Sequence, residues 1–443
     1  MNDGRLRQHR QRGVASLVVV AVLFLILSLV AAYTNRNLIF EQRTSGNLHR
    51  STQAFEAAEA GVEWALTMLN AGRIDASCAP SADPADTSFR QRYLAIDAAS
   101  GVVAPAGVLT AAFESTVWPS CVFNGTDWNC SCPAAGALAL EAPPGAGIFP
   151  AFRVRFSRAS VTQPGVVRLQ VNGCTRLDDD CLDFPARAIG GEGRATVTTL
   201  IALRSGLPAP PLAALTVQGD VTSTGTLQAV NTDAGAGGIA LHIGNDLAPP
   251  APVIVTGPPG TPAEEARRDD AALAALPTDR SAPYTDATVF THTFALWPDL
   301  YRGQPGAVVL DCNAGCNAQD VRDAAQAHPG RVLWADGDVR LAGGGDIGSP
   351  GAPVLLVVAG RDGDGDGAFE AEVEIGVDFH GLLLVHADQW NSGGNGTVRG
   401  AVVSDGDLAG NGAFGVVYDR AVLERLRWTT GSFVRVPGGW RDF

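Results

Sequence analysis

An acidic run, Asp362-Gly363-Asp364-Gly365-Asp366-Gly367, is the pattern in the sequence with the most definite chemistry. Carboxylates at alternate positions, with glycine at the sixth, match the first half of a calcium-binding loop. At the twelfth position, where an EF-hand loop has a bidentate glutamate, the chain has Val373, so Glu370, Glu372 or Glu374 would have to take that place. Two interpretations stay open: a structural calcium site at Asp362, Asp364 and Asp366, or a solvated acidic turn.

Other residue patterns that would indicate catalysis are missing from the sequence. It contains no GxSxG elbow, P-loop or HExxH motif. His380, His386 and Asp388 could share one face of a strand, but core or surface histidines are the simpler interpretation. We therefore expect a protein that is not an enzyme and that has no cofactor other than a structural calcium ion. The rival class is a membrane-tethered β-helical hydrolase, which would require carboxylates gathered along one groove.

The cysteines number eight, and all of them follow the long apolar segment near the N-terminus. An even number of cysteines in an exported region indicates an oxidising compartment and disulfides. The close pairs Cys174/Cys181 and Cys312/Cys316 predict two short disulfide loops. The other four allow three pairings, among which the sequence does not choose: Cys78, Cys121, Cys130 and Cys132. Zinc is disfavoured, because no CxxC pair and no suitably spaced histidine accompany them.

The charge of the chain argues against one class of partner. The formal net charge is −14, and the chain has no lysine, so every strongly basic side chain is an arginine. An acidic surface repels the phosphate backbone of nucleic acids, so direct nucleic-acid binding is not expected.

The N-terminal region has the strongest signal. Val14 to Tyr33 is a run of 20 residues without a charge, long enough at about 1.5 Å per residue to cross a bilayer core of roughly 30 Å. Arginines at positions 5, 7, 10 and 12 precede it, which places that side in the cytoplasm and the rest of the chain outside. A cleaved signal peptide and a plain single-span anchor are the alternatives.

The residues after this apolar run predict that the helix continues. Thr34 to Asn70 contains no proline, and a helical stripe runs through it: Phe55, Ala58, Val62, Leu66 and Leu69. Glu56, Glu59 and Glu63 lie off this stripe, as in an amphipathic helix. A single helix from Val14 to about Asn70 would be about 85 Å long, half of it in lipid and half packed on a globular head.

In the order of its parts the chain resembles a type IV prepilin, and more narrowly the PilX-type minor pilins. The resemblance covers roughly residues 8–72 and rests on two motifs, Arg12-Gly13-Val14-Ala15-Ser16-Leu17-Val18 and Ala54-Phe55-Glu56-Ala57-Ala58-Glu59-Ala60-Gly61. The ending, Val436 to Asp442, is similar in a less specific way. The resemblance implies that a prepilin peptidase cuts between Gly13 and Val14 and methylates the new N-terminus.

The same resemblance assigns roles to residues of the helix. Leu17, Val18, Phe55, Ala58 and Glu59 would carry helix packing and assembly. Major pilins have glutamate at the fifth mature position, where its charge meets a neighbour's amino terminus, whereas this chain has Val18 there. A buried carboxylate is costly unless it is paired, so its absence suits a subunit at or near the filament tip.

For the rest of the chain the patterns predict β-structure. We expect an α+β fold: a leader (1–13), a long helix (14–72, transmembrane over 14–33), a β-rich head with disulfides (73–205), a β segment with a Pro-rich linker (206–300) and a C-terminal β-rich domain (301–443). Three similar sequences recur without a fixed period, at Gln218–Val221, Asp336–Val339 and Asp405–Leu408. They fit an irregular β-helix or simply Asp-Gly turns.

These expectations combine into one functional hypothesis. The chain would be a minor pilin that takes part in type IV pilus assembly at or near the tip, with an inner-membrane helix and a periplasmic, then surface-exposed, head. Its partners would be other minor and major pilins, the prepilin peptidase and a large tip adhesin, and adhesion or twitching motility would lie downstream. The alternatives are a tip pseudopilin of a type II secretion system and a membrane-anchored surface adhesin.

Overall fold

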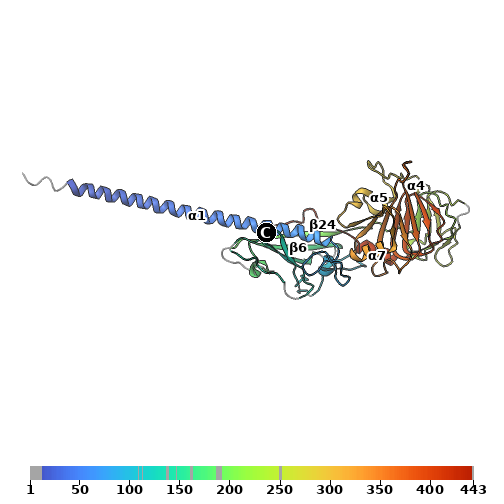
Figure 1. Ribbon diagram of the computed structural model, residues 1–443, viewed down its shortest axis with the longest axis horizontal. Helices are drawn as coiled ribbons and strands as arrows, with labels where there is room; N and C mark the ends of the chain where they lie inside the picture. The colour runs from blue at the N-terminus through green and yellow to red at the C-terminus, as the bar shows by residue number, and fades with distance from the viewer. Residues whose placement is uncertain are drawn as a thin grey trace, which may run out of the picture.

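One long helix projects from an elongated body in the computed structural model, which describes residues 12–107, 109–111, 113–135, 139–145, 147–159, 163–185, 192–248 and 252–441 (Figure 1). This helix, α1, runs from Arg12 to Leu69. Residues 15–52 of it are exposed along their whole length, and burial begins at Gln53. The single long helix predicted from the sequence is therefore confirmed, since no proline interrupts it.

The second half of α1 packs on a six-stranded antiparallel sheet, the head sheet, with strand order β24-β7-β6-β5-β3-β4. The strands are β3 (Ser120–Phe123), β4 (Trp128–Ser131), β5 (Ala151–Arg158), β6 (Val166–Cys174), β7 (Arg194–Ser205) and β24 (Gly431–Arg435). Short elements complete the head: α2 (Phe89–Tyr93), β1 (Leu94–Ile96), β2 (Val103–Pro105) and α3 (Asp179–Leu182). Val62, Leu69, Phe152 and Phe156 are among the buried residues that form its core.

All eight cysteines are paired in the structure. The head holds three of the disulfides, Cys78–Cys132, Cys121–Cys130 and Cys174–Cys181. The fourth, Cys312–Cys316, lies in the next domain. The Cys78–Cys132 bond spans 54 residues and ties the segment after α1 to the strand end after β4. The mostly-β, disulfide-containing head after an apolar helix is thus confirmed.

Between β7 and β24 the chain builds a parallel β-helix. Two parallel sheets form it, a large one of eleven strands and a small one of five; the first five strands of the domain all belong to the large sheet, and the strands after them alternate between the two sheets. The large sheet follows the order β11-β9-β23-β21-β19-β17-β15-β13, with β8, β10 and β12 attached, and the small sheet the order β14-β16-β18-β20-β22. From β13 onward each turn of chain gives one strand to each sheet, so the irregular β-helix that the sequence allowed is what the structure has.

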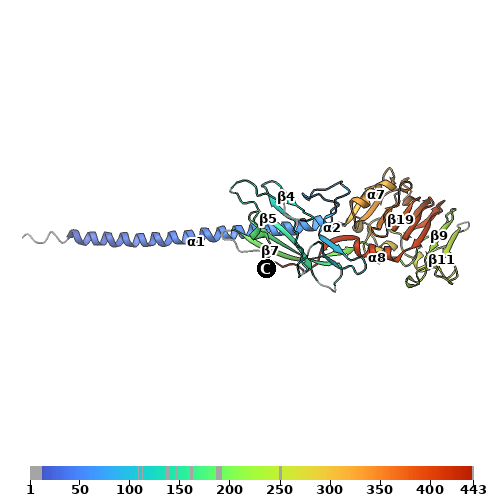
Figure 2. The same ribbon diagram turned by 90° about the horizontal axis from the view of Figure 1, so that it is seen from below.

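The strands of this β-helix do not lie side by side in the order in which they occur in the sequence. The strands are β8 (Leu215–Val217), β9 (Leu227–Val230), β10 (Leu241–Ile243), β11 (Val253–Thr256), β12 (Arg267–Asp269), β13 (Ala307–Asp311), β14 (Cys316–Asn317), β15 (Val332–Asp336), β16 (Val339–Leu341), β17 (Val354–Ala359), β18 (Glu370–Ile375), β19 (Asp378–His386), β20 (Gln389–Gly393), β21 (Thr397–Ser404), β22 (Asp407–Gly410) and β23 (Gly415–Tyr418). Of the first strands in sequence, β8 pairs with β21 and is followed outward by β10 and β12, while β9 pairs with β23 and is followed by β11. They lie towards the end of the molecule farthest from α1 (Figure 2). The chain then returns to start β13 at the opposite edge of the large sheet.

Helices cover the outer face of the large sheet. They are α5 (Val289–Phe294), α6 (Pro298–Arg302) and α8 (Arg420–Thr429), and the remaining short helices are α4 (Ala271–Ala274), α7 (Ala318–Ala327) and the 3-10 turn η1 (Ala234–Ala236). In β17, Leu356 and Val358 point into the β-helix core, while Leu355 and Val357 pack with α5, α6 and α8. Burial on both faces explains why the central strands read as unbroken apolar runs.

The three similar sequences are corners of the β-helix. The amide of Gly219 donates to the Gly406 carbonyl at 3.2 Å, and the amide of Asp220 donates to Asp407 Oδ1 at 2.8 Å, so two of the corners stack directly. The third, Asp336 to Val339, joins β15 to β16. Their spacing is irregular because insertions such as α7 and the acidic loop lengthen individual turns.

The domain order differs from the linear division that the sequence suggested at residues 300 and 301. Residues 215–269 and 307–418 contribute strands to one sheet, and β24 belongs to the head. The β-helix is therefore an insertion in the head sheet between β7 and β24, which pair with each other antiparallel. Pairing between distant segments determines this arrangement, and a composition shift along the chain does not show it.

Candidate assembly surface and acidic loop

The exposed half of α1 is the first candidate surface. Among the described residues, one helix is long and apolar enough to cross a membrane, and its most apolar window has a mean hydropathy of 2.9 with no residue buried. Leu17 and Val18, assigned to assembly, are 71% and 54% exposed. The backbone of Gly13 and Val14 lies in α1, whereas the side chain of Val14 and the leader residues 1–11 are outside the described residues.

Apolar exposure continues on α1 beyond the predicted span. Leu38, Ile39, Phe40 and Leu48 are all exposed, with Phe40 at 71%. Several large apolar side chains exposed on one helix indicate contact with lipid or with other helices. Since these four residues follow Tyr33, where the uncharged run ends, contact with other helices is the interpretation that fits them.

The contact between α1 and the head is made through small side chains. Ala54, Ala58, Gly61 and Ala65 are buried against the head sheet. A Cβ atom built on Gly61 would come within 2.8 Å of the Phe152 ring. Of the assembly residues, the structure buries Ala58 fully, leaves Glu59 exposed, and places Phe55 half-buried with its ring 6.4 Å from that of Trp440.

The alanines and the glycine of the motif at residues 54–61 therefore form a close-packing face, and the glutamates of that motif, Glu56 and Glu59, are exposed. One turn further along α1, Glu63 is exposed as well. Glu63 forms an ion pair with Arg435 of β24 at 2.6 Å. The expected stripe emphasised the large side chains, and it missed Ala54, Ala57, Gly61 and Ala65. Their regular spacing of three or four residues was the signal that could have identified them.

The end of α1 is fixed by an arginine that contacts both domains. Arg90 is buried and donates from Nε to the Leu69 carbonyl, from Nη1 to the Gly330 carbonyl and from Nη2 to the Gly431 carbonyl. A cation at the C-terminus of a helix interacts favourably with the helix dipole. Asn70 adds a pair of hydrogen bonds to the backbone of Phe433 in β24. The long helix, the head and the β-helix therefore meet at one joint.

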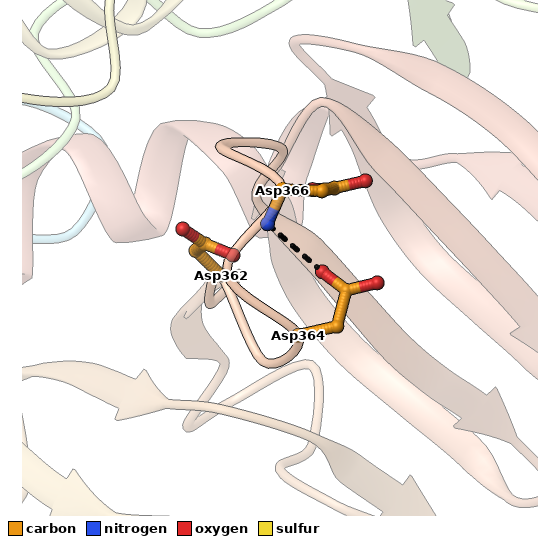
Figure 3. A group of neighbouring side chains, drawn as sticks. All are labelled: Asp362, Asp364 and Asp366. Atoms are coloured by element: carbon orange, nitrogen blue, oxygen red, sulfur yellow. Dashed lines mark hydrogen bonds between the residues drawn. The ribbon is translucent and has the colours of Figure 1, made fainter.

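The acidic loop lies between β17 and β18, with its three aspartates exposed. One ligand oxygen each from Asp362, Asp364 and Asp366 lies within 4.8 Å of the others. Figure 3 shows the three side chains on their loop. Their carboxylates accept hydrogen bonds from the amides of Gly365, Asp366 and Ala368. This arrangement could supply three oxygen ligands to a hard cation such as calcium. The calcium site itself stays a prediction.

The glutamates offered as substitutes for the twelfth ligand lie on β18, on the surface of the small sheet. Arg340 contacts two of them, Glu374 at 2.7 Å and Glu372 at 4.0 Å. Asp338 accepts a hydrogen bond from the amide of Glu372. These carboxylates line a shallow groove. Because an arginine pairs with two of them, we assign the groove no acid–base chemistry.

A buried charged cluster joins the returning chain to the β-helix, and the sequence did not reveal it. Arg280, between α4 and α5, contacts Asp405 at 2.8 Å and Asp388 at 3.0 Å, and it also donates to the carbonyl oxygens of Ala387 and Asp405. His386 Nδ1 lies 2.6 Å from Asp405 Oδ2. Burial by itself raises the pKa of Asp405, but Arg280 and His386 outweigh it and lower that pKa below its ordinary value.

The shared face of His380, His386 and Asp388, which the sequence offered only as the less simple interpretation, is partly present. His386 and Asp388 both contact Arg280, whereas His380 Nδ1 is buried without a partner among the described residues. All three nitrogens of the Arg280 guanidinium have carboxylate or carbonyl partners. Such a cluster pins the segment between α4 and α5 to the corners of the β-helix, and we assign it a structural role.

Comparison with known proteins connects the N-terminal part to one family. Residues 12–63 match the family model described as PilX N-terminal, which confirms the predicted resemblance over the matched residues. No curated protein matches the chain. Among solved structures the chain is similar to the competence-associated pilin ComZ from Thermus thermophilus, at 10% identity, with 89% of this chain and 98% of that chain covered and a TM-score of 0.22. The two chains do not superpose well at that score, and we take neither fold nor function from this likeness.

Proposed function

We propose that this chain, whose residues 12–63 are a PilX-type N-terminal segment, is a minor pilin that takes part in assembling a type IV pilus at or near its tip. The proposal rests on the difference between the two halves of α1. Its first half is apolar and exposed, and its second half is fixed into the head by close packing. A helix of this kind can leave the membrane and pack among the helices of other pilins without disturbing the head.

The position of the β-helix supports a place at the tip. This domain extends the body away from the free end of α1, along the long axis of the molecule (Figure 1). In a filament whose N-terminal helices pack side by side, the space ahead of each head is taken by the next subunits. A domain that projects ahead fits best where no subunit follows. The absence of a carboxylate at Val18 is consistent with the same place.

The further parts of the proposal concern location and partners. The helix would hold the subunit in the inner membrane, with the head and β-helix in the periplasm until the filament carries them out. The partners would be other minor and major pilins, the prepilin peptidase and a large tip adhesin. The β-helix at the far end would be the part presented outward, and a surface adhesin is the second candidate function for that reason.

In-cell photo-crosslinking tests both the assembly surface and the place in the filament. A photoreactive amino acid is introduced at Phe40, exposed on α1, or at Ile254, which is 52% exposed in β11 at the far end of the β-helix. We expect adducts with pilins from position 40 and none with pilins from position 254. Equal pilin adducts from both positions would place the subunit along the shaft, and no pilin adduct from position 40 would contradict the proposal.

A further inference from the structure

A cleft of about 650 Å³ lies between the head and the β-helix domain. Residues 73–96 of the head form one wall, and residues 322–354 of the β-helix domain form most of the other. Its volume is in the range usual for small-molecule sites. The cleft brings together four arginines and a histidine from both domains: Arg73, Arg90, Arg322, Arg331 and His328.

The positive charge in this cleft is not compensated by carboxylates. Among the described residues, no carboxylate oxygen lies within 4.0 Å of any of the four arginines, although the chain as a whole carries a net charge of −14. Two aspartates also line the cleft, but Asp86 is the ion-pair partner of Arg92, and Asp346 is exposed. An acidic protein that gathers cations in one cavity without carboxylate partners indicates an anionic ligand.

The cations are also close enough to repel one another. Burial lowers the pKa of His328, and the neighbouring Arg331 and Arg73 lower it further. Burial, with a contribution from Arg331, lowers the pKa of Arg90 to about 9. Both effects disfavour the positive forms, and an anion in the cleft would relieve them.

Part of the charge has a structural explanation. Two helices end beside the cleft, α1 at Leu69 and α7 at Ala327, and their C-terminal carbonyls favour cations. Arg90 accounts for the end of α1, whereas at the end of α7 the Ala327 carbonyl accepts from the backbone amide of Arg73 and not from its charged side chain. Arg322 donates to the carbonyls of Gly343 and Gly345.

Two sets of donors remain without a structural role. The Arg73 guanidinium has no hydrogen bond or ion pair among the described residues. Arg331 donates from Nη2 to the carbonyls of Pro305 and Ala307, and its Nη1 lies 3.4 Å from His328 Nδ1, while its Nε is buried and has no partner among the described residues. Among the described residues, the head therefore supplies a guanidinium without a partner, that of Arg73, and the β-helix domain supplies a buried donor without a partner, Arg331 Nε. Guanidinium groups bind carboxylates and phosphates by charge-assisted hydrogen bonds.

We propose that this cleft binds an anionic group, a carboxylate or a phosphate, between Arg73 of the head and Arg331 of the β-helix domain. The anion would join the two domains at the joint where α1 ends. The cleft would bind it whether or not the chain enters a filament, so the test below is independent of the pilin assignment.

Calorimetric titration of the purified full-length chain in detergent micelles tests this proposal. Inorganic phosphate and succinate serve as separate probes at one fixed ionic strength, with the wild type, Arg73→Gln and Arg168→Gln compared. Arg168 is exposed on β6 in the head sheet, so its variant carries the same change of charge away from the cleft. We expect saturable binding of phosphate, of succinate or of both, weakened about tenfold or more in Arg73→Gln and unchanged in Arg168→Gln.

The pattern of binding identifies the chemistry. Phosphate alone or succinate alone would indicate which group the cleft prefers, and binding of both would indicate a general anion site. Thermal unfolding without added anion checks that Arg73→Gln is as stable as the wild type, as expected for a guanidinium with no hydrogen bond or ion pair among the described residues. The proposal is overturned if neither probe binds, or if Arg73→Gln binds both as tightly as the wild type.

Discussion

Ala58 in α1 and Gly173 in β6 approach so closely that no side chain fits between their backbones. A Cβ atom built on Gly173 would lie 2.5 Å from the Ala58 amide nitrogen and 2.1 Å from the Ala54 carbonyl oxygen. Contacts below 3.0 Å require something to move, and here the obstructing atoms are backbone. The attachment of the long helix to the head thus depends on small residues of α1 and on Gly173 in the head sheet.

This packing predicts a ranking of three glycine-to-alanine variants. Gly173→Ala should cost the most stability, because backbone must shift. Gly61→Ala should cost about 1–3 kcal/mol, since side chains of Val171 and Phe152 obstruct its Cβ. Gly46→Ala, in the same helix with nothing within 4 Å, should be neutral or stabilising by up to about 1 kcal/mol. Thermal unfolding of the full chain in detergent measures all three, and equal stability of the Gly46 and Gly61 variants would refute the close-packing account.

The buried cluster around Arg280 predicts that removing the charge of Arg280 lowers the unfolding free energy strongly. Arg280→Gln leaves Asp405 buried without its cation, and the expected loss is about 3–5 kcal/mol of unfolding free energy. Arg399→Gln is the control, because its ion pair with Asp378 at 3.5 Å is substantially exposed and should contribute about 0–1 kcal/mol. Chemical denaturation compares the two, and a similar small loss in both would mean that the cluster does not hold the returning segment.

The same cluster predicts a response to acid. Because the pKa of Asp405 is lowered in the folded chain, its ionised form contributes stability above the ordinary aspartate pKa of about 4. That contribution is lost as the pH falls below about 4 towards the folded-state pKa. The stability of the wild type should therefore fall more steeply below about pH 4 than that of Asp405→Asn. Parallel curves for the two proteins would show that Asp405 does not titrate as described.

For the acidic loop, calcium binding is the expected result. Titration of the full chain with calcium should show one saturable site that Asp364→Asn abolishes or strongly weakens. Asp311→Asn, at an exposed position of β13, should leave binding unchanged. No calcium-dependent heat in the wild type would instead favour the solvated acidic turn, whose carboxylates bond to their own backbone amides.

The sequence predicted those parts of the fold that depend on local patterns. The uncharged run from Val14 and the proline-free stretch to Asn70 predicted α1, and the Asp-Gly corners allowed a β-helix. The insertion of that β-helix between β7 and β24 was not predictable, because it is determined by pairing of Leu203 with Phe433 and of Leu215 with Val402. Such partners are about 190–230 residues apart, and nothing in their local sequence identifies them.

The candidate sites, too, were predictable only where neighbouring residues in the sequence form them. The aspartates of the acidic loop are neighbours in sequence, so their proximity in space was predictable. Arg90 and Arg280 each act on segments more than 100 residues away, Arg90 on Gly330 and Arg280 on Asp388 and Asp405. Their neighbouring sequence gives no sign of burial, and only the fold shows what they contact.

The mature N-terminus tests the central claim most directly. Mass spectrometry of the protein, from strains with and without the prepilin peptidase, identifies its first residue. The pilin account predicts a chain that begins at methylated Val14 and that depends on the peptidase. A chain that begins at Met1, or near Thr34, and that is the same in both strains would contradict the account and indicate an ordinary anchor or a cleaved signal peptide.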